Sequence, residues 1–337
     1  MQSIENEFDQ CIKCGLCLAA CPVGKIRFLE KYTPRGKIQL AKQHTFNALD
    51  VSDHYRDIFA ACLLCGACAV TCPSGVGLKD VFLEMRAEIA RQLGPHPKVE
   101  AVLEALDLNH NISVPMVQGI PKNFVKILER AGLDFAILAG EEWCCGFPFA
   151  ASGYPEKAQT MMAHNLERIA RMGASAVVFT CPSCYHTWKT HDPADLKLFH
   201  STEFINQLIQ TGRLTPGAVD KTVTFHDPCD LGRNGGVFDA PREIIRAIPG
   251  ISLVELAGNR AQSVCCGGGG NLEMTNPDLA GAIAARKLDE IIKTGANTVV
   301  TACQQCIRTI KGTARKQKRD LDVVDITDLV IEAISHA

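Results

Sequence analysis

Apolar residues recur with a helical period near the start of the chain. In residues 78–93, "LKDVFLEMRAEIARQL", they fall on one face of a helix. The residues on that face are Val81, Phe82, Met85 and Ile89. Pro34 occupies a position typical of a helix start and is followed by the apolar residues of "KIQLA". We therefore predict that residues 1–95 are mostly helical, and that "GPHPK" at 94–98 is a linker.

In the remainder of the chain, short β-branched runs alternate with helical patterns. Strands are predicted at 176–180 ("AVVFT"), 222–225 ("TVTF") and 298–302 ("TVVTA"). Helices are predicted over 241–248 and over a segment that ends at Gly295. Alternation of this kind is typical of α/β modules, in which sites form where strands end.

The second part of the chain contains an internal repeat. "GASAVVFTCPSCYHT" at 173–187 aligns without a gap with "GANTVVTACQQCIRT" at 295–309. Upstream, "CCG" occurs at 144–146 and again at 265–267. A second copy of the same elements predicts two related modules.

We expect a multi-domain α+β protein, which 337 residues are enough to form. A helical domain at 1–95 is followed by two α/β modules, called here the first repeat (100–215) and the second repeat (216–337).

The chain has 17 cysteines, an excess that indicates metal binding where no secretory signal is present. "CIKCGLCLAACP" and "CLLCGACAVTCP" both have the bacterial ferredoxin spacing, in which the fourth cysteine ligates the other cluster. We therefore predict two cubane 4Fe–4S clusters in a ferredoxin-like domain. The first would be bound by Cys11, Cys14, Cys17 and Cys72. The second would be bound by Cys62, Cys65, Cys68 and Cys21.

Five further cysteines lie in the second repeat: Cys229, Cys265, Cys266, Cys303 and Cys306. This set is larger than a zinc ion or a cubane uses, and an adjacent pair can supply one bridging and one terminal thiolate. The glycines of "VCCGGGG" let the backbone bend around a cluster and leave space beside it.

The first repeat departs from this pattern. Its cysteines are Cys144, Cys145, Cys181 and Cys184. The position that corresponds to Cys229 is Leu108, next to Asn109 and His110, and the strand expected before it is cut short. The four thiolates suit tetrahedral zinc, a cluster with an altered ligand, or an empty site.

Together these segments resemble the heterodisulfide reductase D family, which joins a ferredoxin domain to two CCG domains. The iron–sulfur subunits of glycolate and lactate oxidases and of anaerobic glycerol-3-phosphate dehydrogenase share this architecture. The motifs that carry the resemblance are "PRGK" (34–37), "TCPSGV" (71–76), "EEWCCG" (141–146), "FHDPCDLGR" (225–233) and "TACQQC" (301–306). The resemblance implies a noncubane 4Fe–4S cluster on the five cysteines of the second repeat.

The totals restrict location and partners. A net charge of −2 gives no basic excess for nucleic acid, and no apolar run is long enough for a direct membrane span. The polar, acidic start is unlike a signal peptide, so we expect a cytoplasmic protein whose membrane contact comes only through a partner. Without a flavin or nicotinamide motif, electrons must be exchanged with another protein. Oxygen-sensitive clusters favour an anaerobic setting.

Several polar residues beside the motifs have more than one interpretation. His226 and Asp227 are the candidates for catalytic proton transfer, or they cap a turn around Pro228. Arg35 and Lys37 either dock an acidic partner or belong to the solvated face of a helix.

Three functions follow from these patterns. The first is a heterodisulfide-reductase-like subunit that cleaves a disulfide at the second repeat and pairs with a membrane cytochrome b. The second is a pure relay for a flavoprotein dehydrogenase of a 2-hydroxy acid, glycerol phosphate or acyl-CoA, or for a low-potential reductase of the benzoyl-CoA type. The third is a zinc-stabilised scaffold.

Overall fold

The computed structural model describes residues 4–111, 119–191, 193 and 196–336. The chain divides into two compact units, and each unit combines separate stretches of sequence. The first compact unit contains Met1–Ile112, Gly146–Met161 and Val264–Ala285. The second compact unit contains Ser113–Cys145, Met162–Ser263 and Arg286–Ala337. Both sequence repeats therefore contribute residues to both units.

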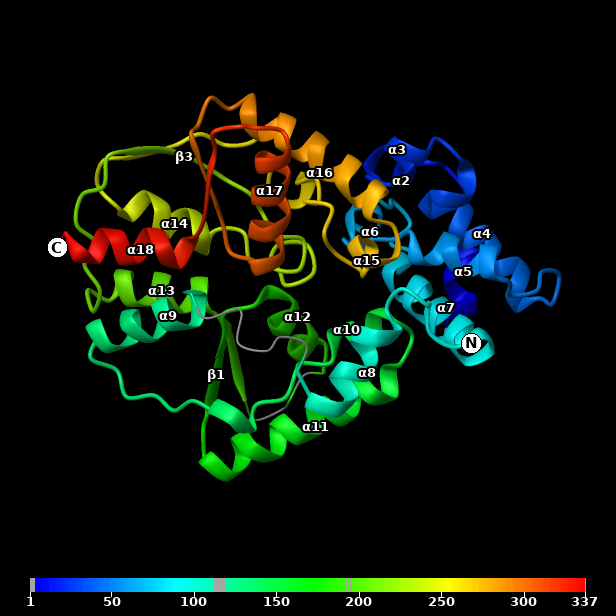
Figure 1. The fold of residues 1–337 in the computed structure, drawn as a ribbon, viewed down its shortest axis with the longest axis horizontal. Coiled ribbons are helices and arrows are strands. Elements are labelled where there is room, and N and C mark those ends of the chain that lie inside the picture. Colours follow the sequence, from blue (N-terminus) through cyan, green and yellow to red (C-terminus); the bar gives the residue numbers. More distant parts are fainter. Residues whose placement is uncertain (1–3, 112–118, 192, 194–195, 337) are drawn as a thin grey trace. The chain divides into compact units, whose positions relative to one another are not determined.

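The first compact unit is built mainly from helices (Figure 1). Its N-terminal helices are α1 (Glu5–Gln10), α2 (Leu16–Ala20), α3 (Gly24–Arg27), the 3-10 turn η2 (Glu30–Tyr32), α4 (Pro34–Thr45), α5 (Asp53–Ala60), α6 (Ala67–Val70), α7 (Leu78–Leu93) and α8 (Glu100–Asn109). To these the repeats add α10 (Phe147–Ala151), α15 (Leu272–Thr275) and the first turns of α11 (Pro155–Met172) and α16 (Pro277–Ile292). The prediction of a helical N-terminal part is confirmed.

Helices α4 and α7 begin where the sequence predicted. Pro34 is the first residue of α4, and the Thr33 hydroxyl caps the helix by accepting a hydrogen bond of 3.1 Å from the Gly36 amide. A Cβ atom on Gly36 would overlap the carbonyl oxygen of Glu30, so this turn requires glycine. On α7, the predicted apolar face is buried in the core of the unit.

In the described residues the strands of the second compact unit form two parallel sheets. One sheet pairs β1 (Ala176–Phe179) with β2 (Lys197–His200). The other has the order β4-β3-β5-β6, with β3 (Lys221–Phe225), β4 (Ile251–Leu253), β5 (Thr298–Thr301) and β6 (Asp322–Asp325). Strand β5 is buried throughout, as expected for a β-branched strand in the middle of a parallel sheet.

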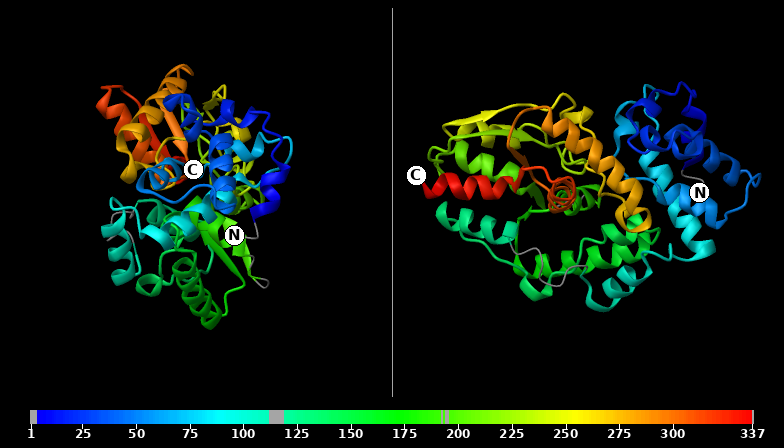
Figure 2. Two further views of the ribbon diagram at one scale, coloured as in Figure 1. Left: turned by 90° about the vertical axis from the view of Figure 1, so that its right-hand side faces the viewer. Right: turned by 45° about the horizontal axis from the view of Figure 1, so that its top comes forward.

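Helices from both repeats surround these sheets. They are α9 (Gly119–Arg130), α12 (Pro182–His191), α13 (Ser201–Gln210), α14 (Ala240–Ala247), α17 (Gln304–Lys316) and α18 (Ile326–Ser335), with short 3-10 turns η3 (Ala139–Glu141) and η4 (Arg260–Gln262). Helix α9 packs on α18 and α13 packs on α14 (Figures 1 and 2). Ile127, Ile205, Phe225, Ile245 and Leu329 belong to one hydrophobic core, so the two repeats share it.

The sequence indicated that the strand expected before Leu108 is cut short, and the structure has a helix in its place. Residues 100–109 form helix α8, which ends at His110 with a φ of 55°. The apolar residues explain the difference, since Leu103 and Leu106 are spaced three apart and both are buried. Asn109 is the last residue of this helix.

No helix in the described part of the chain is long and apolar enough to cross a membrane.

Helices α13 and α18 occupy equivalent places after β2 and β6, but the pKa values of their capping residues are shifted in opposite directions. His200 caps α13, and burial lowers its pKa from 6.5 to about 3. Asp325 caps α18, and burial raises its pKa from 3.8 to about 7. As pH rises from 4 to 6.5, the stabilisation due to neutral His200 is regained while that due to protonated Asp325 is lost.

We therefore expect opposite pH slopes from two single variants. Relative to the natural protein, His200→Asn should lose stability as pH rises between about 4 and 6.5, and Asp325→Asn should gain it, each by up to about 1.4 kcal/mol per pH unit. Anaerobic denaturant unfolding at several pH values measures both slopes. The double variant His200→Asn/Asp325→Asn is the matched control. Its stability should depend on pH as that of the natural protein does, because the two opposite contributions are removed together. Equal slopes in the two single variants would contradict these pKa shifts.

Candidate metal centres

Four cysteines from both ferredoxin motifs line one cavity of the first compact unit. These are Cys21, Cys62, Cys65 and Cys68. Burial and the neighbouring sulfurs, that of Cys65 foremost, raise the pKa of the Cys68 thiol well above its usual value of 9.0. Four thiols on the wall of one cavity are a set that a metal cluster can bind as thiolates.

A second cavity in the same unit is lined by the other four cysteines of the motifs: Cys11, Cys14, Cys17 and Cys72. Here the fourth cysteine, Cys72, comes from the later motif, while Cys21 of the earlier motif lines the other cavity. This exchange is the arrangement expected for a two-cluster ferredoxin. The two cavities differ in exposure, because Cys14 is exposed and Cys65 is buried.

Arg35 and Lys37 lie on opposite sides of Gly36, and each lines a different cavity. Arg35 lines the cavity of Cys14 and pairs at the surface with Glu30 at 2.7 Å. Lys37 lines the cavity of Cys65, is only 2 % exposed and donates a hydrogen bond of 2.9 Å to the Ala61 carbonyl. Both interpretations made for Lys37 are therefore wrong, since a buried side chain neither docks a partner nor faces solvent.

The glycine run after Cys266 lies against the loop that carries Cys62. Both segments belong to the first compact unit. A Cβ atom on Gly270 would overlap the carbonyl oxygen of Cys62 and lie 2.7 Å from the carbonyl carbon of Leu63. Because Gly270 also has a φ of +60°, no other residue fits there without strain. The glycines thus bring the Cys265–Cys266 segment up to a predicted cubane ligand.

Arg86 of α7 joins these segments by hydrogen bonds to backbone carbonyls. It is 6 % exposed. Its guanidinium donates to Phe59, Ala60 and Cys62 beside the ferredoxin motif, to Ala151 of α10 and to Gly270 of the glycine run. The bonds to Cys62 and Gly270 measure 2.7 and 3.0 Å. The pattern of α7 gave no signal for this residue, because a charged residue within an amphipathic helix is normally taken as solvated.

The cysteines of the first repeat belong to the second compact unit, and three of them are close together. Hydrogen bonds with Cys145 and Cys181, together with burial, raise the pKa of the Cys184 thiol well above its usual value. Trp143 stacks on His164 of α11, with ring centroids 3.7 Å apart. Trp143 directly precedes Cys144 in sequence, so this stacking ties the cysteine-bearing segment to α11.

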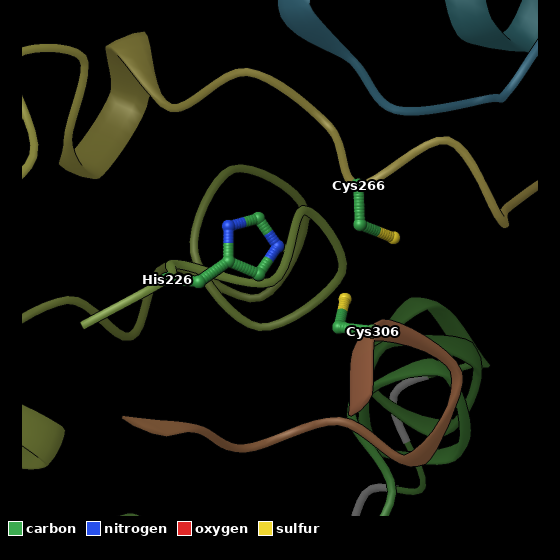
Figure 3. A group of neighbouring side chains, drawn as sticks. All are labelled: His226, Cys266 and Cys306. Atoms are coloured by element: carbon green, nitrogen blue, oxygen red, sulfur yellow. The ribbon is translucent and has the colours of Figure 1, made fainter. Parts of the chain in front are cut away.

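In the second repeat, Cys229 follows β3, and Cys303 and Cys306 stand at the start of α17. His226, at the end of β3, is fully buried, and one of its ring nitrogens lies within 4.8 Å of the Cys306 sulfur (Figure 3). Cys265 and Cys266, the latter also drawn there, belong to the first compact unit. His226 therefore lies beside one of the predicted cluster ligands, Cys306.

Asp227 lies in a buried ion pair. Arg242 of α14 is 0 % exposed and donates to both carboxylate oxygens of Asp227, at 2.7 and 2.9 Å. The guanidinium also binds Glu255, and Asp227 accepts a third bond from the Arg260 amide. A carboxylate held in this way fixes the backbone around Pro228, and the geometry favours this role over proton transfer.

The loops of the two repeats hold each other within the second compact unit. The Ser183 hydroxyl, between the cysteines of the first repeat, donates to Asp230 at 2.6 Å, directly after Cys229. In return Gln304, between Cys303 and Cys306, donates to the Thr180 carbonyl at 3.2 Å. The C-x2-C segments of the two repeats are therefore neighbours, which the sequence spacing did not predict.

The donor sets fit iron–sulfur clusters. Each ferredoxin cavity has four sulfurs on its walls. Buried Lys37 has a cavity of thiols beside it and no carboxylate partner among the described residues, so an anionic group suits the site. A cubane with four thiolate ligands is such a group.

Comparison with known proteins agrees with this interpretation. The model of a 4Fe–4S dicluster domain matches residues 7–76, and that of a cysteine-rich domain, CCG, matches residues 109–189 and 223–311. The chain belongs to the CCG cysteine-rich domain family. It is an iron–sulfur electron-transfer protein of the class that forms oxidoreductase subunits.

Three of its relatives are two reductase components and a probable iron–sulfur oxidoreductase. The D component of the dihydromethanophenazine:CoB–CoM heterodisulfide reductase of Methanosarcina barkeri is 28% identical, over 97% of this chain and 94% of that protein. The B component of the CoM/CoB fumarate reductase of Methanothermobacter marburgensis is 25% identical, over 96% and 72%. The probable iron-sulfur-binding oxidoreductase FadF of Bacillus subtilis is 30% identical, over 65% and 32%.

Proposed function

We propose that this chain is the heterodisulfide-reductase-like iron–sulfur subunit of a larger complex. Two cubanes would be held by the two sets of exchanged ferredoxin cysteines, and a noncubane cluster by the five cysteines of the second repeat. These clusters would supply one-electron transfer. The observation that carries the proposal is the glycine run, whose Gly270 lies against the carbonyl of Cys62 and so ties the Cys265–Cys266 segment to a ferredoxin motif.

The protein's own residues would prepare the second repeat for a disulfide substrate. The glycines after Cys266 leave one side of that segment without side chains. His226, close to the Cys306 sulfur, would give a proton to a leaving thiolate. Asp227 and Arg242 would hold the loop between His226 and Cys229 in place.

A pure relay is the second candidate, and one observation favours it. The first repeat lacks a counterpart of Cys229, since Leu108 lies in helix α8. Its remaining cysteines would then hold zinc, an altered cluster or nothing. In that case a flavoprotein dehydrogenase or a low-potential reductase would exchange electrons with the chain.

The partner distinguishes these roles. Anaerobic purification from the native host should bring along either a membrane cytochrome b, as a disulfide reductase requires, or a flavoprotein, as a relay requires. We propose that the chain is cytoplasmic and reaches a membrane only through such a partner. Metal analysis of the same preparation measures whether zinc is present beside iron.

We expect a thiol to change the electron paramagnetic resonance (EPR) spectrum of the oxidised protein. A small alkyl thiol such as 2-mercaptoethanol should give a new signal, because a reductase must hold the thiolate product at the cluster of the second repeat. The corresponding methyl thioether, which cannot form a thiolate, is the control. Cys229→Ala should abolish the new signal. A spectrum that is indifferent to the thiol would instead assign the relay role.

A further inference from the structure

Two buried cations flank the cavity lined by Cys21, Cys62, Cys65 and Cys68. Lys37 is 2 % exposed and lines this cavity, and Arg86 is 6 % exposed and donates to the Cys62 carbonyl. Burial lowers the pKa of Lys37, while the neighbouring thiols of Cys62 and Cys21 raise it and Arg86 lowers it further. Both side chains donate to the same stretch of backbone, Lys37 to the carbonyl of Ala61 and Arg86 to that of Cys62.

Within the described residues no carboxylate pairs with either cation. Lys37 donates to the Ala61 carbonyl and lies over the ring of Phe82, and Arg86 donates only to backbone carbonyls. Burying an uncompensated charge costs several kcal/mol, so two of them side by side need a nearby anion. A cubane with four thiolates is an anion in both redox states and gains one negative charge on reduction.

The other ferredoxin cavity has a different electrostatic environment. Two cations line it: Lys13, which is exposed, and Arg35, whose side chain is 33% exposed and is paired with Glu30 at 2.7 Å. Its cysteine Cys14 is exposed. Solvent and the carboxylate therefore cancel most of the field of Arg35 at that cavity.

We propose that Lys37 and Arg86 make the cubane of Cys21, Cys62, Cys65 and Cys68 the higher-potential cluster of the ferredoxin domain. Buried positive charge stabilises the reduced form, which carries the extra electron. With both clusters bound, the two side chains would favour an electron on this cubane over the exposed one, with no bond or proton changed. The inference rests on the proposed function, since it requires both cubanes.

Arg86 also has a positioning role in the same proposal. Its guanidinium bridges the carbonyls of Cys62 and Gly270, so the segment that follows Cys265 and Cys266 is fixed beside the favoured cubane. With the clusters bound, Lys37 and Arg86 would favour the electron at the cubane beside that segment.

An EPR-monitored redox titration of the anaerobically purified full chain tests the proposal. Lys37→Met should lower one cubane midpoint by at least 59 mV, a tenfold change in a one-electron equilibrium, and leave the other unchanged. Lys37→Arg, which keeps the charge, should retain the natural midpoints. Arg35→Met is the matched control at the neighbouring cavity and should move neither midpoint by that amount. Lys37→Gln, which keeps a donor for Ala61, provides the same test if Lys37→Met does not fold.

A second experiment assigns the shifted midpoint to one of the two cubanes. In a Cys14→Ala variant the exposed cubane is lost, so the cubane of Cys21, Cys62, Cys65 and Cys68 is the one that remains in the ferredoxin domain. If the midpoint in that background does not respond to Lys37→Met, or if only the other cubane shifts, the inference is overturned. A natural protein without cubane signals would overturn the proposed function instead, so the two failures are distinguishable.

The positioning role has its own measurement. Arg86→Lys keeps the charge but loses the fork that bridges Cys62 and Gly270. Amide hydrogen exchange in a peptide covering residues 266–272 should become at least tenfold faster, while the cubane midpoint shifts by less than 59 mV. Unchanged exchange would remove Arg86 from this role and leave Lys37 as the tuning residue.

Discussion

Replacing Cys21 with alanine is expected to remove the cubane of the second ferredoxin motif and to leave that of its own motif. The reason is that Cys21 lines the cavity of Cys62, Cys65 and Cys68, while Cys72 lines that of Cys14. Iron should fall by about four per chain, the content of one cubane. The EPR spectrum that remains should match that of Cys65→Ala and differ from that of Cys14→Ala.

Matched variants make the assignment independent of overall stability. Cys72→Ala should have the spectrum of Cys14→Ala, because these two line the same cavity. The four variants should therefore give two spectra, one shared by Cys21→Ala and Cys65→Ala and the other by Cys72→Ala and Cys14→Ala. If Cys21→Ala instead had the spectrum of Cys14→Ala, the exchange of the fourth cysteine between the motifs would be refuted.

The two ferredoxin cysteine sets could be predicted from the sequence because the spacing of their ligands is local. Likewise, the burial of Val81 and Phe82 on α7 follows from a helical period, and Cys181, Cys229 and Cys303 follow strands as expected. The repeat also indicated that β1–α12 and β5–α17 would be equivalent. Each of these features depends on residues within a few turns or one strand of each other.

The environment of Lys37 could not be predicted in this way. Its burial is due to Ala61 and Phe82, which are distant in sequence, and a lysine after a helix start is normally solvated. Arg86 is a similar case, because its partners come from three separated segments. The sequence indicated only that the strand before Leu108 is cut short, and the helix at 100–109 was missed because alignment with the second repeat outweighed the local spacing of Leu103 and Leu106.

Asp227 was a candidate for proton transfer in the sequence, but in the structure it has a structural role. It stands between His226 and Cys229, which suggested proton transfer. Its carboxylate is nevertheless bound at both oxygens by Arg242, which is itself fully buried. Removing one member of such a pair leaves the other as an uncompensated buried charge.

We therefore expect Asp227→Ala to destabilise the protein by about 3–5 kcal/mol. Anaerobic denaturant unfolding, followed by circular dichroism, measures this change. Arg242→Met should cost a similar amount, and the double variant Asp227→Ala/Arg242→Met should be less destabilised than the sum, because neither charge is then left alone. Glu255 is the matched control: it binds the same guanidinium but is one-third exposed, so Glu255→Gln should cost less.

The same variants separate the two roles of Asp227. If the carboxylate moved protons, Asp227→Asn would alter the pH dependence of the thiol-induced EPR signal while leaving the unfolding free energy nearly unchanged. The ion pair predicts the reverse, with a large loss of stability and an unchanged pH dependence. His226→Gln should weaken the thiol-induced signal without a comparable loss of stability, because the Asp227–Arg242 pair that fixes the loop is intact.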